Sequence, residues 1–211
     1  MTVHVHANCA MSLDGCLGLP GPRPLKLSSP EDLRRVHELR AKSDAILVGI
    51  GTILADDPKL TVKWELLGRA PGTNPTRIIL DSTLRTPQSS EVAKPGTPTL
   101  LFHAREAKGG PSGVDKVGVP TDKKGDLALR AVLEALDERG VRRLMVEGGP
   151  HVLSAFIEQG LVDELTIFVA PILVGFPDAP RLFSGRGPLE LGLKLDSSKN
   201  LGGGVLLRFE R

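Results

Sequence analysis

The stretch from Val48 to Thr61, VGIGTILADDPKLT, constrains the fold of this chain more than any other segment. An apolar run ending at Val48 has the composition of a buried strand, and it leads into a Gly-x-Gly turn, a short helical turn and an Asp-Asp-Pro. Glycines let a backbone approach a ligand closely, and open α/β sheets bind ligands at the carboxyl ends of their strands. We therefore expect a ligand-facing turn here, although an Asp-Asp-Pro alone is often only a helix stop.

A second glycine turn, Glu147-Gly-Gly149, follows the short apolar strand 144–146. Pro150 suits the first position of a helix expected from His151 to about Gln159, because its missing N–H costs nothing there. The free amides at such a helix start attract anions. A carboxylate beside a phosphate alone would be out of place, so Glu147 indicates hydrogen bonds from hydroxyl or amine groups of a second molecule. The alternative is a tight strand-to-helix turn with an exposed glutamate.

Strands and helices alternate along the chain. Helices are expected from about Ser28 to Ala41, with Leu33 and His37 on or beside the inner face, and from Asp126 to Arg139. Residues 64–74 read as a polar excursion. Apolar or alternating runs predict strands at 3–9, 45–50, 76–81, 99–103, 114–119, 144–146, 164–169, 189–195 and 204–209. The pattern predicts one α/β domain over 1–211, with a central mixed, mostly parallel sheet flanked by helices and a C-terminal antiparallel hairpin.

The composition, with 40% hydrophobic and 25% charged residues, is that of a soluble globular protein. A net charge of +2 and the lack of tyrosine argue against nucleic-acid binding. Cys9 and Cys16 fit neither a disulfide framework nor a metal motif, and His4 and His6 share a strand face without a third ligand. No secretory signal or membrane-spanning run is evident. We expect a cytoplasmic protein with reduced thiols, no metal and no membrane partner.

Six motifs occur in order: Met11–Gly15, Leu39–Leu47, Gly51–Thr61, Arg77–Ser82, Glu147–Gly149 and Gly160–Glu164. Together they resemble the pyrimidine reductases of riboflavin biosynthesis, which are the reductase half of the bacterial bifunctional deaminase-reductase and its stand-alone archaeal and fungal relatives. The resemblance covers nearly the whole chain. It implies a dihydrofolate-reductase-like fold, NADPH as hydride donor, a homodimer, and reduction of a ribosylamino-pyrimidinone 5′-phosphate to its ribitylamino product. The first glycine turn lacks the third glycine of the Rossmann fingerprint, which agrees with this different fold.

The resemblance also implies ligand contacts. NADPH would be contacted by Ala10, Thr52, Asp56, Asp81, Ser82, Gly148, Gly149, Pro150, His151, Val152 and Leu153. The substrate would be contacted by Arg40, Leu60, Lys63 and Glu147. Lys63 stands where the family often has arginine, and lysine serves a phosphate as a point charge instead of a fork. In the loop 17–27, Pro24 and Lys26 depart from the bacterial pattern, so no contact is assigned there.

Two carboxylates, Asp56 and Glu147, are the catalytic candidates, and the sequence does not choose between them; Asp57 is expected to be structural. A carboxylate near the reacting centre could stabilise an iminium charge or relay a proton, while the cofactor carries the redox chemistry.

Two other functions stay open: a dihydrofolate-reductase-like enzyme acting on another pteridine or pyrimidine, and a non-catalytic nucleotide-binding module. Carboxylates beside the expected phosphate sites argue against the module. Deaminase activity is excluded, because the chain lacks the His-x-Glu and Pro-Cys-x-x-Cys of zinc deaminases. Whether the pyrimidine is reduced before or after deamination is not decided by the sequence, although the stand-alone length resembles the archaeal and fungal order, reduction first.

Overall fold

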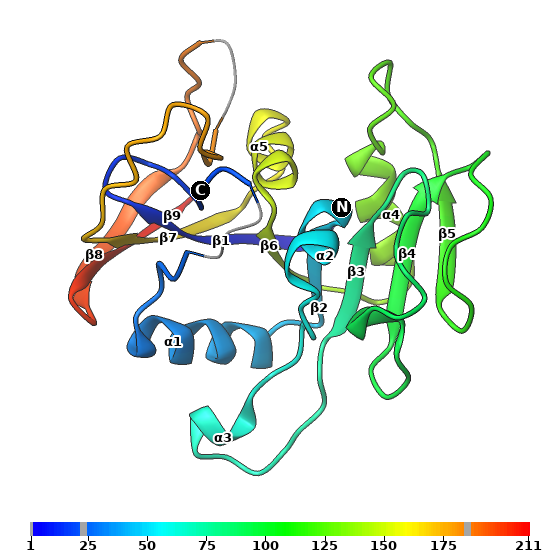
Figure 1. Ribbon diagram of the computed structural model, residues 1–211, viewed down its shortest axis with the longest axis horizontal. Coiled ribbons are helices and arrows are strands. Elements are labelled where there is room, and N and C mark those ends of the chain that lie inside the picture. The colour runs from blue at the N-terminus through cyan, green and yellow to red at the C-terminus, as the bar shows by residue number, and fades with distance from the viewer. Residues whose placement is uncertain (1, 22–24, 184–186) are drawn as a thin grey trace.

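A nine-stranded sheet forms the centre of the molecule (Figure 1), and the computed structural model describes residues 2–21, 25–183 and 187–211. The strands are β1 (His4–Ser12), β2 (Ala45–Gly49), β3 (Thr76–Leu80), β4 (Thr99–Ala104), β5 (Asp115–Val119), β6 (Arg143–Gly148), β7 (Glu164–Ala170), β8 (Lys194–Leu201) and β9 (Gly204–Glu210). Their order is β5-β4-β3-β2-β6-β1-β7-β9-β8. The pairs from β5 to β7 are parallel, and β9 is antiparallel to both β7 and β8. The predicted mixed sheet with a final hairpin is confirmed.

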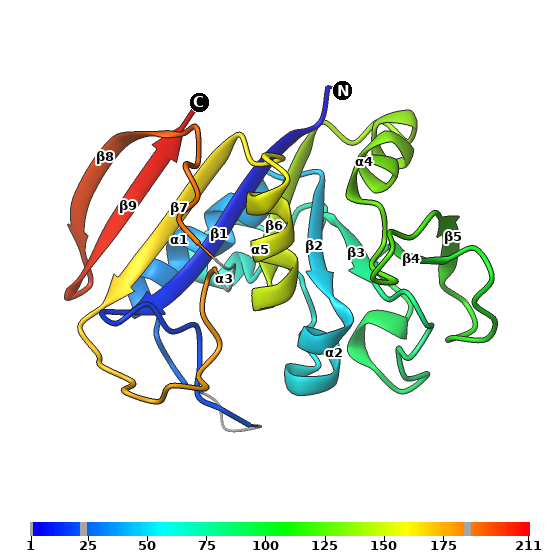
Figure 2. The same cartoon turned by 90° about the horizontal axis from the view of Figure 1, so that it is seen from above.

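Helices cover both faces of this sheet: α1 (Pro30–Ala41), α2 (Ile50–Asp56), α3 (Trp64–Leu67), α4 (Leu129–Glu138) and α5 (Pro150–Glu158). Figure 2 shows α5 in front of the sheet and α1 behind it. Accordingly, α4 and α5 pack with Leu47 and Val146 in one core, whereas Val36 and Leu39 of α1 pack with Ile46 and Met145 in the other. Each strand therefore buries alternate residues on opposite faces, as a parallel sheet requires.

The start of α1 follows directly from its sequence. The Ser29 side chain caps the helix by accepting a hydrogen bond from the Asp32 amide at 3.1 Å, and Pro30 occupies the first helical position. The inner stripe of the helix is partly polar, because it faces Asn8 on β1: the Arg35 guanidinium donates to Asn8 Oδ1 and Asp32 Oδ1, both at 2.8 Å. The predicted inward position of Leu33 is therefore wrong, since Leu33 is 46% exposed.

One further prediction of local structure is wrong, and another lacked a detail. The penultimate strand is β8 and not residues 189–195; its sequence KLDSSKNL is exposed on both faces, so no hydrophobic alternation marks it. Its register is set instead by the turn at Gly202 and Gly203, whose φ values of 50° and 81° suit a two-residue hairpin turn. The excursion at 64–74 contains the short helix α3, which ends where Gly68 takes a φ of 64°.

The parallel arrangement gathers the carboxyl ends of β1, β2, β3 and β6 at one edge of the sheet (Figure 2). Because β2 pairs with β6, the two glycine turns that follow these strands are neighbours. Within the described ranges, no helix has the length and apolar character needed to cross a membrane.

Candidate active site at the carboxyl edge of the sheet

The two glycine turns are in contact. A Cβ atom added to Gly49 would lie 2.7 Å from Val152 Cγ2 of α5, and one added to Gly149 would lie 3.2 Å from Thr52 Oγ1 of α2. The distance at Gly49 is too short for a real Cβ contact, so the close approach of the turn after β2 to α5 depends on glycine there, whereas the contact at Gly149 is only tight.

Glu147 lies in a β-bulge. Leu47 pairs with Val146, but Val48 pairs with Gly148, so Glu147 is an extra residue in β6. Bulges of this kind re-aim a side chain and increase the local twist. Here the bulge falls at the carboxyl end of the strand, where the side chain of Glu147 meets α1.

Arg40 of α1 holds the Glu147 carboxylate with a two-pronged ion pair. Its Nε and one terminal nitrogen donate to the two carboxylate oxygens at 2.7 and 2.5 Å, and the other terminal nitrogen donates to the Thr61 carbonyl at 2.9 Å. The side chains of Arg40 and Glu147 are only 17% and 9% exposed. Burial by itself would lower the pKa of Arg40, yet the charge and hydrogen bonds of Glu147 raise that pKa.

The segment that follows the Asp-Asp-Pro runs beside this ion pair. Leu60 is buried with a φ of 51°, and the Lys63 amide donates to His37 Nδ1 at 3.1 Å. Burial, followed by the charges of Arg40 and Lys63, lowers the pKa of His37 and so favours its neutral form. The predicted substrate residues Arg40, Lys63 and Glu147 are thus brought to one region. His37 was not predicted as a member, although it lies one helical turn before Arg40 on the same face of α1.

A cavity of about 1110 Å³ opens at the carboxyl edge of the sheet. It is lined by nearly all the predicted cofactor residues: Ala10, Thr52, Asp56, Ser82 and residues 148–153. Glu147 also lines it, so this residue connects the cavity with the Arg40 side of the sheet. Arg40, Leu60 and Lys63 are not part of the cavity wall. Lys26 lines the cavity, whereas Pro24 lies outside the described residues.

Asp81 does not line this cavity. Its side chain is completely buried, and its Oδ2 accepts hydrogen bonds from the amide and the hydroxyl of Thr86, both at 2.7 Å. These bonds to Thr86 stabilise the turn after β3 from the protein interior. The neighbouring residue Ser82 lines the cavity. The sequence motif could not separate these two adjacent polar residues, because their directions are set by the turn.

The adjacent acids Asp56 and Asp57 also take different directions. Asp57 ends α2 with a φ of 40°, and its Oδ1 accepts from the Glu91 amide at 2.8 Å. This contact gives Asp57 a structural role, whereas Asp56 is exposed in the cavity wall. Asp14 is likewise structural: bonds from the Ser12 hydroxyl and then from the amides of Gly175 and Val174 hold its pKa well below its usual range.

Some of the lining was missed by sequence reasoning. Residues 17–19 and 25–28 contribute to the cavity wall, as do Arg85 and Lys124. Arg85 carried a usable signal, since it follows Ser82 by three residues in the same turn. The loop residues carried none, because only the folded chain brings them over the strand ends.

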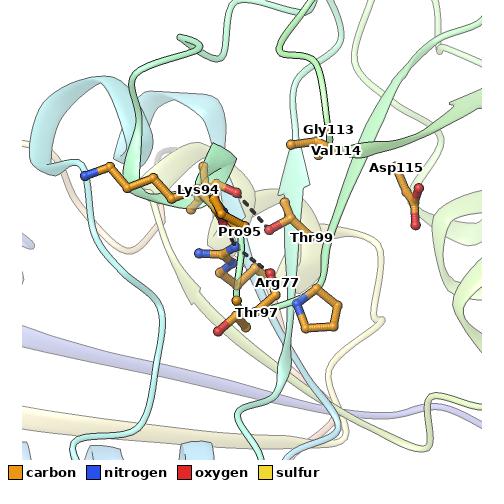
Figure 3. A pocket seen from close by; sticks show the side chains of 11 residues that line it. Arg77, Lys94, Pro95, Thr97, Thr99, Gly113, Val114 and Asp115 are labelled. Carbon is orange, nitrogen blue, oxygen red and sulfur yellow. Dashed lines mark hydrogen bonds between the residues drawn. The ribbon is translucent and has the colours of Figure 1, made fainter.

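A smaller pocket of about 340 Å³ lies away from these residues, beside the loop before β4 (Figure 3). The buried Arg77 guanidinium donates there to the carbonyls of Glu91 at 2.9 Å, Lys94 at 3.0 Å and Thr97 at 2.5 Å. Thr99 donates to the Val92 carbonyl at 2.8 Å. None of the predicted site residues lines this pocket, and the terminal nitrogens of Arg77 are engaged in fixing the loop.

No cluster of three or more potential metal ligands occurs in the described part of the chain. His6 Nε2 instead lies 2.9 Å from Thr166 Oγ1 and 3.4 Å from Glu164 Oε1. Burial is the main cause that lowers the pKa of His6 to about 4.

Comparison with known proteins supplies a family. The model of the "RibD C-terminal domain" family matches residues 3–207. The chain is 40% identical, over 100% of both chains, to the 2,5-diamino-6-ribosylamino-4(3H)-pyrimidinone 5′-phosphate reductase of Archaeoglobus fulgidus. It is 39% identical to the protein of the same name from Methanothermobacter thermautotrophicus, over 99% of this chain and 98% of that one.

Solved structures agree on the fold. A deaminase/reductase from Thermotoga maritima superposes with a TM-score of 0.82 at 24% identity, over 99% of this chain and 56% of that one. The riboflavin biosynthesis reductase Rib7 of Saccharomyces cerevisiae gives 0.78 at 24% identity, over 99% and 90%. The dihydrofolate-reductase-like fold expected from the motifs is therefore confirmed. This chain belongs to the RibD C-terminal domain family.

Proposed function

We propose that this protein is an NADPH-dependent reductase of riboflavin biosynthesis, which converts a ribosylamino-pyrimidinone 5′-phosphate into the ribitylamino compound. The observation that carries the proposal is the position of Glu147, which lines the large cavity and is held by Arg40 from the other side. The two archaeal relatives that match over their full length are named for the 2,5-diamino substrate. We therefore propose that reduction precedes deamination.

The size and the lining of the cavity support a dinucleotide as its ligand. Its volume of about 1110 Å³ lies just above the range of roughly 300–1,000 Å³ typical of small-ligand sites. At the start of α5 no side chain caps the helix, so the amides of Gly149, His151 and Val152 can face a phosphate, whereas Pro150 has no N–H. A Cβ atom at Gly149 would lie 3.2 Å from Thr52 Oγ1, so a larger residue there would crowd this helix start. When bound, NADPH would supply the hydride.

The roles proposed for the side chains follow from their surroundings. Glu147, kept in place by Arg40, would stabilise the positive charge that develops when the sugar ring opens to an imine at C1. Asp56, exposed in the same cavity, is the second candidate for moving a proton. Arg40 uses three of the five N–H donors of a guanidinium in the bonds described above, so two remain for a substrate phosphate. Lys63 would add a point charge at the same end.

One pair of assays tests the proposal: NADPH oxidation followed with the diamino and with the deaminated ribosylaminopyrimidine 5′-phosphate. We expect turnover with the diamino compound. In Lys63→Ala we expect KM for that substrate to rise about tenfold or more, because a charge-assisted phosphate contact contributes roughly 1.5–3 kcal/mol. NADPH affinity should stay constant in this variant. Absence of turnover with both compounds would contradict the proposed activity.

A homodimer and a cytoplasmic location belong to the same proposal. The strand β8 ends the sheet, and its residues are exposed, which leaves a surface for a second copy. Sedimentation velocity should give twice the chain mass of 22.5 kDa; a monomer at micromolar concentration would contradict the dimer. The location is supported by Cys9 and Cys16, which are buried, unpaired thiols.

A further inference from the structure

Residues 57–63 connect α2 to α3 without regular secondary structure, and α3 lies beside α1 (Figure 1). Main-chain groups of this segment bond to side chains instead. The Thr61 carbonyl accepts a hydrogen bond from Arg40, and the Val62 amide donates to Asn74 Oδ1, both at 2.9 Å. Two of the residues proposed to contact the substrate belong to this segment, so its path decides where they lie.

His37 of α1 supplies the next of these bonds. The residue is only 6% exposed, and its Nδ1 lies 3.1 Å from the amide nitrogen of Lys63. An amide N–H can only donate, so Nδ1 carries no proton and the neutral ring bears its proton on Nε2. Three residues separate His37 from Arg40, which places both on one face of the helix. This face therefore holds the segment at two points, the Thr61 carbonyl and the Lys63 amide.

The surroundings of His37 keep its ring neutral. Charged groups approach it from its own helix (Arg40), from the segment and α3 (Lys63 and Glu65) and from β6 (Glu147). Burial, followed by the two cations, lowers the pKa of His37, and the two carboxylates act in the opposite direction without reversing this result. A protonated ring would set an N–H donor against the Lys63 amide, so the bond requires the neutral form.

We infer that His37 is a positioning residue for the substrate: its Nδ1 holds the main chain of Lys63 and thereby fixes the segment that carries the proposed phosphate and sugar contacts. This inference rests on the proposed function and adds a residue to it. His37 acts through the main chain of Lys63 and not by contact with the reacting atoms. Because the same helix face carries Arg40, which holds Glu147, α1 aligns the phosphate contact and the carboxylate together.

Steady-state kinetics with NADPH and the diamino ribosylaminopyrimidine 5′-phosphate test the inference in His37→Leu and His37→Asn. Leucine fills the space without offering an acceptor, whereas the side-chain oxygen of asparagine stands close to the place of Nδ1. We expect His37→Leu to raise KM for the substrate roughly 3- to 10-fold, the loss of one neutral hydrogen bond that orders the segment. Its kcat and its affinity for NADPH should change little, and His37→Asn should bring KM back close to the wild-type value.

His103→Leu is the matched control. His103 is a half-buried histidine of β4 whose Nδ1 lies 2.8 Å from the Ala104 carbonyl oxygen, and it does not line the cavity. This variant should have wild-type kinetics. An unchanged KM in His37→Leu, or equal losses in His37→Leu and His37→Asn, would overturn the positioning role.

NMR of the intact protein tests the bond without any turnover. With isotope-labelled histidine, His37 should show a bare Nδ1 and a proton on Nε2. The Lys63 amide should exchange with solvent faster in His37→Leu than in the wild type or in His37→Asn, because it has lost its acceptor. A proton on Nδ1, or equal exchange in all three proteins, would overturn the inference while the wild type still reduces the substrate. If the wild type reduces neither pyrimidine, the proposed function fails and the inference fails with it.

Discussion

At the scale of single residues, the central feature of the site is the ion pair between Arg40 and Glu147. The family motifs assign both residues to the substrate, whereas the structure joins them to each other. A buried carboxylate with a fixed, bidentate partner is oriented before any ligand arrives, which is the preorganisation that electrostatic catalysis requires. In the proposed reaction Arg40 would therefore act in two ways, through its remaining donors and through the position of Glu147.

Glu147→Gln tests the charge at this position. The amide keeps the shape but offers one acceptor oxygen in place of two, and it cannot balance a developing cation. We expect kcat/KM to fall roughly 10- to 150-fold, corresponding to about 1.5–3 kcal/mol of lost charged hydrogen bonding. Glu158→Gln, another carboxylate of the cavity wall, serves as the control and should keep most of its activity. Wild-type kinetics in Glu147→Gln would remove Glu147 from the mechanism and transfer the catalytic role to Asp56.

A double-mutant cycle with Arg40→Met and Glu147→Gln tests the coupling of the pair. Arg40→Met leaves a nearly buried carboxylate without its partner, so urea unfolding should show a loss of about 3 kcal/mol. The double variant should lose clearly less than the sum of the single losses, because the uncompensated charge is gone. Additive losses would mean that the two side chains act independently.

His6 makes stability depend on pH. Its folded-state pKa of about 4 lies below the ordinary value of 6.5, because burial opposes the charged imidazole. Between these values the unfolded chain binds a proton that the folded protein does not, so stability falls as pH drops from 6.5 to 4, by about 1.4 kcal/mol per unit. His6→Gln cannot titrate, so the stability advantage of the wild type over it should shrink by about 3 kcal/mol from pH 7 to pH 4.

Urea unfolding at several pH values measures this difference. The control is His151→Gln, which removes a histidine side chain that is 76% exposed. A constant difference between wild type and His6→Gln across the range would contradict the burial effect. The neighbouring charges do not reverse the lowering of the His6 pKa. Glu164 raises this pKa, whereas Arg35, His4 and Arg208 lower it further.

At the scale of elements, the contact between the turn after β2 and helix α5 holds the two halves of the site together. Gly49→Ala places a Cβ atom 2.7 Å from Val152 Cγ2, so one element must move. Overpacking of this kind costs about 1–3 kcal/mol, and NADPH affinity should fall because the helix start shifts. Thermal unfolding and NADPH titration measure both effects.

Two further variants test whether the clash with Val152 causes the effects expected of Gly49→Ala. Val152→Ala in the Gly49→Ala background removes the clashing methyl group and should restore NADPH affinity in part. Gly51→Ala, two residues away, meets no atom within 4 Å and lies in a helix, so it should be neutral or slightly stabilising. Equal destabilisation by both alanines would show that the contact with α5 is unimportant.

The elements also show what the sequence could predict. The parallel strands were found because strands buried on both faces are continuous apolar runs. The strand β8 was misplaced because it is polar and exposed, and its register depends on a glycine turn. The bulge at Glu147 could not be foreseen, since it exists only in the pairing of β6 with β2. For the same reason, the motifs placed Glu147 and Arg40 in the site but not in contact.

At the scale of the whole molecule, the proposed site has two regions at the carboxyl edge of the sheet. The cavity at the carboxyl edge, bounded by α2 and α5, is proposed for the dinucleotide, and the Arg40 and Lys63 side, beside α1 and α3, for the sugar phosphate. Glu147 belongs to both regions, because the bulge directs it from the cavity wall toward α1. Hydride transfer to the sugar carbon would then take place beside this carboxylate.

The most direct test of this account follows the hydride itself. The protein is incubated with NADPH carrying deuterium at the transferable position of the nicotinamide and with the diamino ribosylaminopyrimidine 5′-phosphate, and the product is analysed by mass spectrometry and NMR. We predict a ribitylamino product with deuterium at C1′, and a much slower reaction that gives the same product in Glu147→Gln. A product without the label, or with the label on the pyrimidine ring, would contradict it.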